Sequence, residues 1–125
     1  MNIIGYFEIQ ASNPEQAIEF YTNVFGWKYK ESDATGGGFE YLEFGTNPRN
    51  SGALYQINPD WFEGNPPPPH MLVYIAVDDV DEIASKAFDL DAKIIKSPMD
   101  IPNVGRMCII NDPTGAMIAF FTLKH

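Results

Sequence analysis

The hydrophobic positions in the first half of the chain change their spacing from one segment to the next. Residues 3–10 form an extended apolar-rich run, which is typical of a strand. Within 14–25 the apolar residues recur every three or four positions, which predicts a helix with one face against a sheet. Three further strands are predicted at 27–30, 39–44 and 53–57, and Gly36–Gly38 is expected to be a hairpin turn between the first two.

The second half repeats this succession. Residues 71–77 predict a strand, and Ile83, Ala84, Ala87 and Phe88 give the apolar face of a helix. Strands are then expected at 92–96, 107–110 and 116–123, with a turn at Asp112–Gly115 before the last one. The order strand, helix, three strands therefore occurs twice, which predicts an α+β fold with eight strands.

Both predicted helices carry the same start signal. Asn13 and Asp79 are suitable N-cap residues, and a glutamine or glutamate, Gln16 and Glu82, follows each of them three positions later. An offset of 66 residues superimposes the two caps and also places Tyr6 on Leu72. The two halves are therefore predicted to be structural repeats.

The length of 125 residues corresponds to a single domain. We expect a first module over about 1–57, a linker over about 58–70 and a second module over about 71–125. The linker contains Pro66–Pro69, and four consecutive prolines favour an extended connector with few backbone donors. Such a connector is extended enough for the two modules to pair within one chain or between two chains.

Composition and charge exclude several classes of protein. Apolar residues make up 45% of the chain, which is enough for a buried core and excludes intrinsic disorder. The formal net charge of -9 disfavours nucleic acid and anionic membrane surfaces as partners. We expect a cytoplasmic protein, because no apolar run is long enough for a membrane span and no leader pattern precedes the first strand. The single cysteine, Cys108, lies in an apolar run and is expected to be a buried small hydrophobe.

Several segments together resemble the glyoxalase/bleomycin resistance protein/dioxygenase family, also called the vicinal oxygen chelate superfamily. They are Tyr6–Ile9, Asn13–Tyr21, Val24–Trp27, Gly105–Arg106 and Asp112–Gly115. The resemblance covers essentially the whole chain. It implies that two strand-helix-three-strand modules curl their sheet around a cleft for a metal and a small substrate. It also implies that this cleft closes either within one chain or across a swapped dimer, and we expect a homodimer. Its members include lyases, isomerases, dioxygenases, thiol transferases and proteins that sequester drugs.

The resemblance also implies four metal-ligand positions, two in each module. In this sequence they fall on Tyr6, Leu54, Leu72 and Ala119. Leucine and alanine have no donor atom and a neutral tyrosine is a poor one, so we expect no metal and no other cofactor. If the second position is displaced by two residues, Gln56 is the nearest donor, and one amide makes no metal site. His70 and His125 are expected in a solvated loop and at a frayed end.

Glu8 is the candidate catalytic residue. Alternate residues of a strand share a face, so Glu8 should point the same way as Tyr6, deeper in the cavity. A carboxylate in an apolar cavity is suited to act as a general base or to bind a cationic group. The alternatives are that Glu8 is solvated or that it pairs with Arg106. Tyr74 should occupy the matching face of the second module, either as a ligand-binding hydroxyl or as a core residue.

Three functions are compatible with these residues. The preferred one is metal-free binding of a small, partly aromatic organic molecule in an apolar cleft. The candidate ligand-binding residues of this cleft are Tyr6, Leu54, Gln56, Leu72, Tyr74, Arg106 and Ala119. The second is a lyase or isomerase in which Glu8 transfers a proton, and the third is an interaction protein whose cleft its own side chains fill. Trp61 and Phe62 are expected either at the mouth of the cleft or in a contact with a second subunit.

Overall fold

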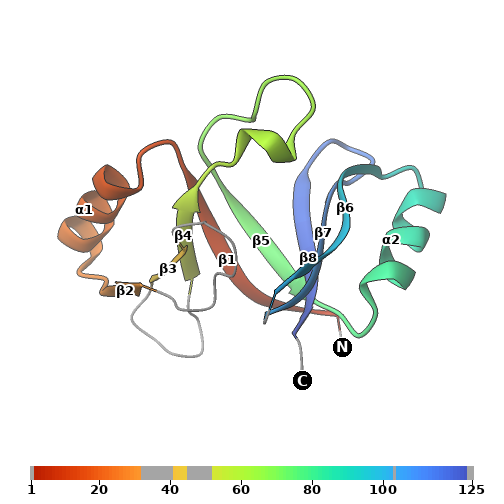
Figure 1. Ribbon diagram of the computed structural model, residues 1–125, viewed down its shortest axis with the longest axis horizontal. Helices are drawn as coiled ribbons and strands as arrows, with labels where there is room; N and C mark the ends of the chain where they lie inside the picture. The colour runs from red at the N-terminus through yellow and green to blue at the C-terminus, as the bar shows by residue number, and fades with distance from the viewer. Residues whose placement is uncertain (1, 32–40, 45–51, 103, 124–125) are drawn as a thin grey trace.

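The computed structural model describes residues 2–31, 41–44, 52–102 and 104–123 (Figure 1). The first repeat comprises β1 (Ile3–Ala11), α1 (Pro14–Phe25), β2 (Tyr29–Glu31), β3 (Tyr41–Phe44) and β4 (Gly52–Gln56). A short 3-10 helix, η1 (Pro59–Trp61), follows. The second repeat comprises β5 (His70–Ala76), α2 (Val80–Asp89), β6 (Lys93–Ile101), β7 (Gly105–Asn111) and β8 (Met117–Leu123). The α+β fold of two βαβββ units is therefore confirmed.

Both helices begin at the residues that the sequence predicted. The Asn13 side chain accepts a hydrogen bond from the backbone N–H of Gln16 at 3.1 Å, and Asp79 accepts one from Glu82 at 3.1 Å. These bonds satisfy amide groups that have no partner inside a helix. At the other end of α1, Gly26 adopts a left-handed φ of 68°, which ends the helix. Among the described residues, neither helix has the length and apolar character that a membrane span requires.

All the strands belong to one 8-stranded sheet with the order β2-β3-β4-β1-β5-β8-β7-β6. Within each unit the first strand pairs with the last in parallel, as β1 with β4 and β5 with β8. The two units meet where β1 pairs antiparallel with β5, and Phe7 is the register partner of Val73. These two residues are also related by the 66-residue offset, so an approximate two-fold axis passes between them.

The two helices cover the same face of the sheet. Ile9 and Leu54 pack against α1, whereas Ile75 and Cys108 pack in the cluster beneath α2. Ile9 shares its face with Ile75, because Ile9 lies opposite Met71 in the register and alternate residues of β5 point the same way. We call this face the helix side and the other the helix-free face. The helices lie at opposite ends of the sheet, with β1 and β5 between them (Figure 1).

Two strands extend two or more residues beyond their predicted bounds. The expected strand at 92–96 continues to Ile101, and the expected strand at 107–110 begins at Gly105 and ends at Asn111. The register between β6 and β7 shifts between Lys96 and Met99. This irregularity accommodates Pro98, which has no backbone N–H for the ladder, so the strand continues past it. The expected turn at Gly36–Gly38 lies outside the described residues.

The turn before the last strand is held by a side chain. Asp112 accepts hydrogen bonds from the backbone N–H groups of Thr114 at 2.8 Å and Ala116 at 3.0 Å, and the Thr114 hydroxyl donates to it at 2.7 Å. These bonds hold the pKa of Asp112 below its ordinary value, and the bond from the Thr114 hydroxyl has the largest effect. The turn predicted at Asp112–Gly115 is confirmed, and it fixes where β8 begins.

Candidate functional site

The helix-free face carries a continuous apolar cluster from the second unit. Its buried members are Leu72, Tyr74, Met107, Ile109, Ala119 and Phe121. Half-buried residues pack against it, among them Tyr6 from the first unit and Trp61 from η1. Register explains the grouping, since Tyr74 lies opposite both Tyr6 on β1 and Ala119 on β8. The structure thus brings together Tyr6, Leu72, Tyr74 and Ala119, as the sequence predicted.

Glu8 is a buried carboxylate at the edge of this cluster, with 3% of its surface exposed. Its Oε1 accepts a hydrogen bond from the Tyr74 hydroxyl at 3.0 Å and another from the side-chain amide of Gln10. Glu8 is therefore neither solvated nor paired with Arg106, the two alternatives that the sequence left open. Buried charged groups are costly unless hydrogen bonds satisfy them, and both donors serve that purpose here.

Aromatic rings pack against Tyr74, which donates its hydroxyl to this carboxylate. The rings of Tyr6 and Tyr74 are stacked, with centroids 4.7 Å apart and an interplanar angle of 9°. Phe121 meets Tyr6 edge to face at 5.0 Å. These contacts restrict the rotamer of Tyr74 and so keep its hydroxyl directed at Glu8. The Glu8–Tyr74 pair spans 66 residues, so the two side chains occupy equivalent positions in the two units.

Sequence reasoning missed two polar residues of the site, Gln10 and Tyr55. Gln10 is 2% exposed and Tyr55 is 3% exposed, and they are register partners on β1 and β4. Burial raises the pKa of the Tyr55 phenol, and the charge of the neighbouring Glu8 raises it further. The phenol therefore stays protonated. Gln10 was detectable from the alternation that selected Tyr6 and Glu8, because it is the next residue on that face.

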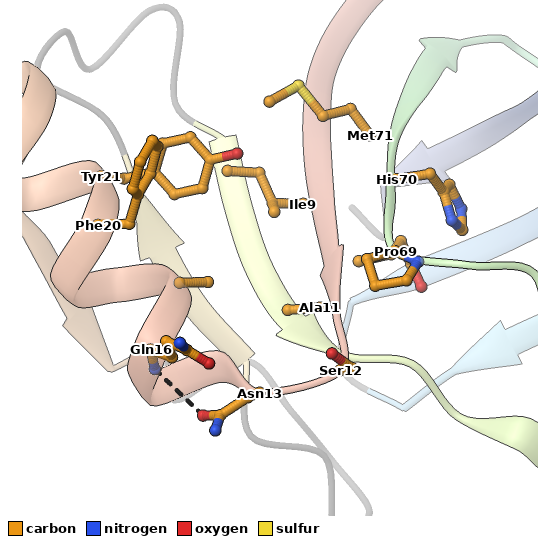
Figure 2. Close-up of a pocket in the computed structure, with 12 residues that line it drawn as sticks. Ile9, Ala11, Ser12, Asn13, Gln16, Phe20, Tyr21, Pro69, His70 and Met71 are labelled. Carbon is orange, nitrogen blue, oxygen red and sulfur yellow. Dashed lines mark hydrogen bonds between the residues drawn. The ribbon is translucent and has the colours of Figure 1, made fainter.

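His70 also differs from its prediction. It is the first residue of β5 and is half-buried, not a solvated loop residue, because β5 begins there by pairing with Gln10. Its Nδ1 lies 2.8 Å from the carbonyl oxygen of Pro68. Its Nε2 is buried and has no hydrogen-bond partner within the part of the chain that the structure describes. Figure 2 shows the imidazole pointing away from Met71, which is consistent with a position on the helix-free face beside Gln10.

Leu54 and Gln56 do not belong to this face. Leu54 is completely buried on the helix side, where Ala17, Ile18 and Tyr21 of α1 surround it, and Gln56 is exposed. The expectation that Leu54 lines the cleft was therefore wrong. Pairing sets the register of β4, with Ala53 opposite Glu8, and this places the neighbouring residue Tyr55 on the helix-free face.

Arg106 was a candidate ligand-binding residue, and the structure places it elsewhere. Its guanidinium donates to both carboxylate oxygens of Asp81 at 2.8 and 2.9 Å, and to Asp100 at 3.0 Å. The bond from Arg106 holds the pKa of Asp81 below its ordinary value. Met107 and Ile109 point to the helix-free face, so the alternation of β7 turns Arg106 toward α2. Its assignment to the cleft was wrong.

The described residues do not fit a divalent metal on the helix-free face. No group of three or more histidine, cysteine, aspartate or glutamate side chains within the described ranges could hold one. Leu72 and Ala119 are buried among apolar neighbours and offer no donor atom. The Oε1 atom of Glu8 already accepts two hydrogen bonds, and a single carboxylate makes no metal site.

A pocket of about 380 Å³ adjoins the helix-free face. Phe62 and Asn65 line it from the segment after η1, and Lys93, Ile95 and Met117 line it from β6 and β8. Ile95 and Met117 also pack against the apolar cluster that contains Tyr74. Of the two aromatic residues that precede the proline run, Phe62 therefore lines a pocket. Trp61 lies over the cluster, with its ring 5.8 Å from that of Tyr55.

Cys108 is fully buried on the helix side. Burial is the main cause that raises the pKa of its thiol to about 11. A raised pKa favours the neutral thiol, so at pH 8 only about 0.1% is thiolate. We expect no reaction of the native protein with an aromatic disulfide reagent at pH 8 over several minutes. In concentrated urea the same reagent should modify the single thiol completely. Rapid stoichiometric modification of the native protein would contradict this assignment.

Proteins that are similar to this chain in sequence include some that are longer than the chain itself. The chain is 34% identical over 117 residues to CFP32 of Mycobacterium tuberculosis, which carries the provisional name glyoxylase. It is 29% identical over 125 residues to the anthracycline biosynthesis protein DnrV of Streptomyces peucetius. These alignments cover 94% and 92% of this chain but only 44% and 45% of the relatives. The chain thus spans about half the length of the curated relatives that it matches.

Solved structures share the fold at low sequence identity. A hypothetical protein of Bacillus halodurans superimposes with a TM-score of 0.70 at 14% identity, over 99% of this chain and 96% of the other. A methylmalonyl-CoA epimerase of Streptomyces coelicolor superimposes with a TM-score of 0.61 at 17% identity, over 100% and 99%. Residues 3–120 match the sequence profile of one superfamily. The chain belongs to the Glyoxalase/Bleomycin resistance protein/Dioxygenase superfamily.

Proposed function

We propose that this protein binds a small, partly aromatic organic molecule on the helix-free face without a metal ion. The observation that supports this most directly is the buried carboxylate of Glu8, which Tyr74 and Gln10 hold among aromatic rings. A carboxylate in such surroundings binds a donor group of a ligand strongly, because water does not compete for it. The adjoining pocket of about 380 Å³ is within the range of small-molecule sites.

The geometry suggests how one ligand would use both features. Met117 in the pocket and Ala119 lie two residues apart on the same face of β8, which corresponds to about 7 Å. Ala119 is the register partner of Tyr74, which contacts Glu8. A ligand with one or two rings has the length to place its apolar part against Met117 and a hydroxyl or amine near Glu8. The name of the Streptomyces relative, an anthracycline biosynthesis protein, is compatible with an organic ligand.

A thermal-shift screen of small aromatic alcohols, amines and acids tests this proposal. A compound at 100 times its dissociation constant stabilises the native state by about 2.7 kcal/mol, which raises the melting temperature by several degrees. Glu8→Gln keeps the shape of the side chain and removes its charge. Because hydrogen bonds to charged groups contribute about 1.5–3 kcal/mol, we expect this variant to bind the same compounds roughly 10–100 times more weakly.

Glu19→Gln is the matched control, because it makes the same chemical change at an exposed position of α1. We expect its affinities to equal those of the wild type. The proposal fails if no compound shifts the melting temperature, which would favour an interaction protein with a filled cleft. It also fails if Glu8→Gln, like the control Glu19→Gln, binds these compounds with the affinity of the wild type.

Proton transfer by Glu8 is the second candidate function. Its carboxylate could accept a proton from a carbon acid and return it to a neighbouring atom, as a lyase or isomerase requires. The 34% identity to a protein with the provisional name glyoxylase favours this chemistry. Turnover of methylglyoxal-thiol adducts, measured with and without added nickel or zinc, distinguishes it from binding alone. An active wild type and an inactive Glu8→Gln variant would identify an enzyme.

A further inference from the structure

A row of side chains crosses the helix-free face from Glu8 to the far edge of the second unit. Glu8 on β1 is the register partner of Leu72 on β5. Tyr74 pairs with Ala119 in the parallel ladder between β5 and β8. Two residues earlier on both strands, Leu72 therefore lies beside Met117. The row thus runs from β1 over β5 to β8.

The same row continues over the last two strands of the sheet. Met117 is the register partner of Asn111 on β7, and Asn111 is the partner of Lys93 on β6. Their neighbours Ile110 and Ile94 pack in the cluster beneath α2. Because alternate residues of a strand point to opposite faces, Asn111 and Lys93 lie on the helix-free face. The row therefore has an acid at one end and a base at the other.

Apolar side chains separate these two charged residues. Leu72 and Met117 both belong to the apolar cluster on the helix-free face. Neighbouring strands lie about 4.8 Å apart, so the four steps from β1 to β6 place Glu8 about 19 Å from Lys93 along the sheet. Met117 is midway between them. A ligand that lies over Met117 and reaches Glu8 with one end therefore directs its other end toward Lys93.

Lys93 lines the pocket of about 380 Å³ as a cation that has no ionic partner among the described residues. The ion pairs within the described ranges engage Lys86 and Arg106 instead. Asn65 and Asn111 line the same pocket, and their side-chain amides can donate hydrogen bonds. An ammonium group accompanied by amide donors is suited to bind a carboxylate or a phosphate.

The charge of the whole chain makes such a place selective. The net charge of -9 repels a small anion from most of the surface, so a lysine in a pocket is a local exception. Glu63 also lines this pocket, from the segment after η1. Its charge opposes that of Lys93, so an anion and a cation in the pocket should respond to its removal with opposite signs.

We propose that the ligand of the helix-free face is an aromatic acid whose anionic group binds Lys93 and Asn111 in this pocket. This inference rests on the proposed function, because the other end of the same molecule carries the hydroxyl or amine that binds Glu8. The apolar part of the ligand lies over Leu72 and Met117. The row then selects elongated molecules with a donor at one end and an anion at the other, and it disfavours neutral aromatic alcohols.

Titration calorimetry with hydroxyphenyl acetate, propanoate and butanoate tests this proposal, with the methyl ester of each acid as its neutral counterpart. The wild type should bind the acids more tightly than the esters. Lys93→Gln should bind the acids about three to ten times more weakly, since it removes the charge of a partly exposed ion pair. Its affinity for the esters should not change. Glu63→Gln removes a like charge and should bind the acids more tightly.

Lys28→Gln is the matched control, because it makes the same chemical change at an exposed lysine between α1 and β2. Lys93 is exposed as well, so neither variant should affect folding. The control should bind acids and esters as the wild type does. An equal loss of acid binding in both lysine variants would overturn the proposal, because the overall charge would then be the cause.

Unchanged acid binding by Lys93→Gln would also overturn it, and Lys93 would then be a solvated residue of an edge strand. Glu8→Gln separates this inference from the proposed function. If Glu8→Gln weakens the binding of acids and esters but Lys93→Gln does not weaken that of the acids, only the anion site is wrong. If neither these compounds nor those of the thermal-shift screen bind the wild type, the proposed function fails and the anion site fails with it.

Discussion

Replacing Gly105 with alanine should lower the free energy of unfolding by about 3 kcal/mol or more. Gly105 is the first residue of β7 and pairs with Leu123. An added Cβ would lie 2.0 Å from the carbonyl oxygen of Thr122 and 2.9 Å from the Cα of Leu123. Both are backbone atoms of β8, so no rotamer change relieves the clash and the strands must separate locally. Urea unfolding followed by circular dichroism measures the loss.

Gly115→Ala is the control for the conformational part of this effect. Gly115 has a φ of 100°, and apart from its two chain neighbours no atom of the described residues lies within 4 Å of the position that a Cβ would take. Alanine there meets only backbone strain, which costs about 1–3 kcal/mol. We expect the Gly105 variant to be the less stable of the two by at least about 1 kcal/mol. Equal stabilities would show that the β7–β8 contact is looser than the structure indicates.

Leu54→Ala should cost about 2–5 kcal/mol of stability, because it leaves a cavity at a completely buried position beneath α1. The same variant should bind any ligand of the helix-free face with unchanged affinity, since Leu54 points to the other side of the sheet. Urea unfolding gives the first quantity. Titration of a compound identified in the screen, well below the melting temperature, gives the second.

Leu123→Ala serves as the comparison for Leu54→Ala. Its side chain is 56% exposed, so the change should alter stability by no more than about 0.5 kcal/mol. If Leu54→Ala proved as mild as this, Leu54 would not be a core residue. If Leu54→Ala weakened ligand binding at a temperature where the variant is fully folded, the separation of the two faces would be wrong.

Local signals predicted the order of the elements correctly. The N-cap bonds of Asn13 and Asp79 and the turn at Asp112 form within a few residues of the side chains concerned, so a single sequence contains all the information that they require. The end of β6 was predicted too early. Its continuation past Pro98 depends on pairing with β7, which no local pattern shows.

The candidate site was predicted only where the register could be inferred. Counting back from the helix caps placed Tyr6 and Leu72 on the correct face, because few residues separate each of them from its cap. The same approach failed for Leu54, since the register of β4 is set by pairing with β1 more than forty residues earlier. His70 was assigned to the proline connector, and only its pairing with Gln10 places it in β5.

The Glu8–Tyr74 hydrogen bond has a consequence for the origin of the chain. Positions 8 and 74 are equivalent in the two units and meet across the approximate two-fold axis. In an assembly of two identical units, each position would face its own copy, and two glutamates there would bring like charges together at hydrogen-bond distance. Two tyrosines would leave no carboxylate. A chain in which the two units are joined covalently avoids both outcomes, because its two positions differ and place an acid opposite its donor.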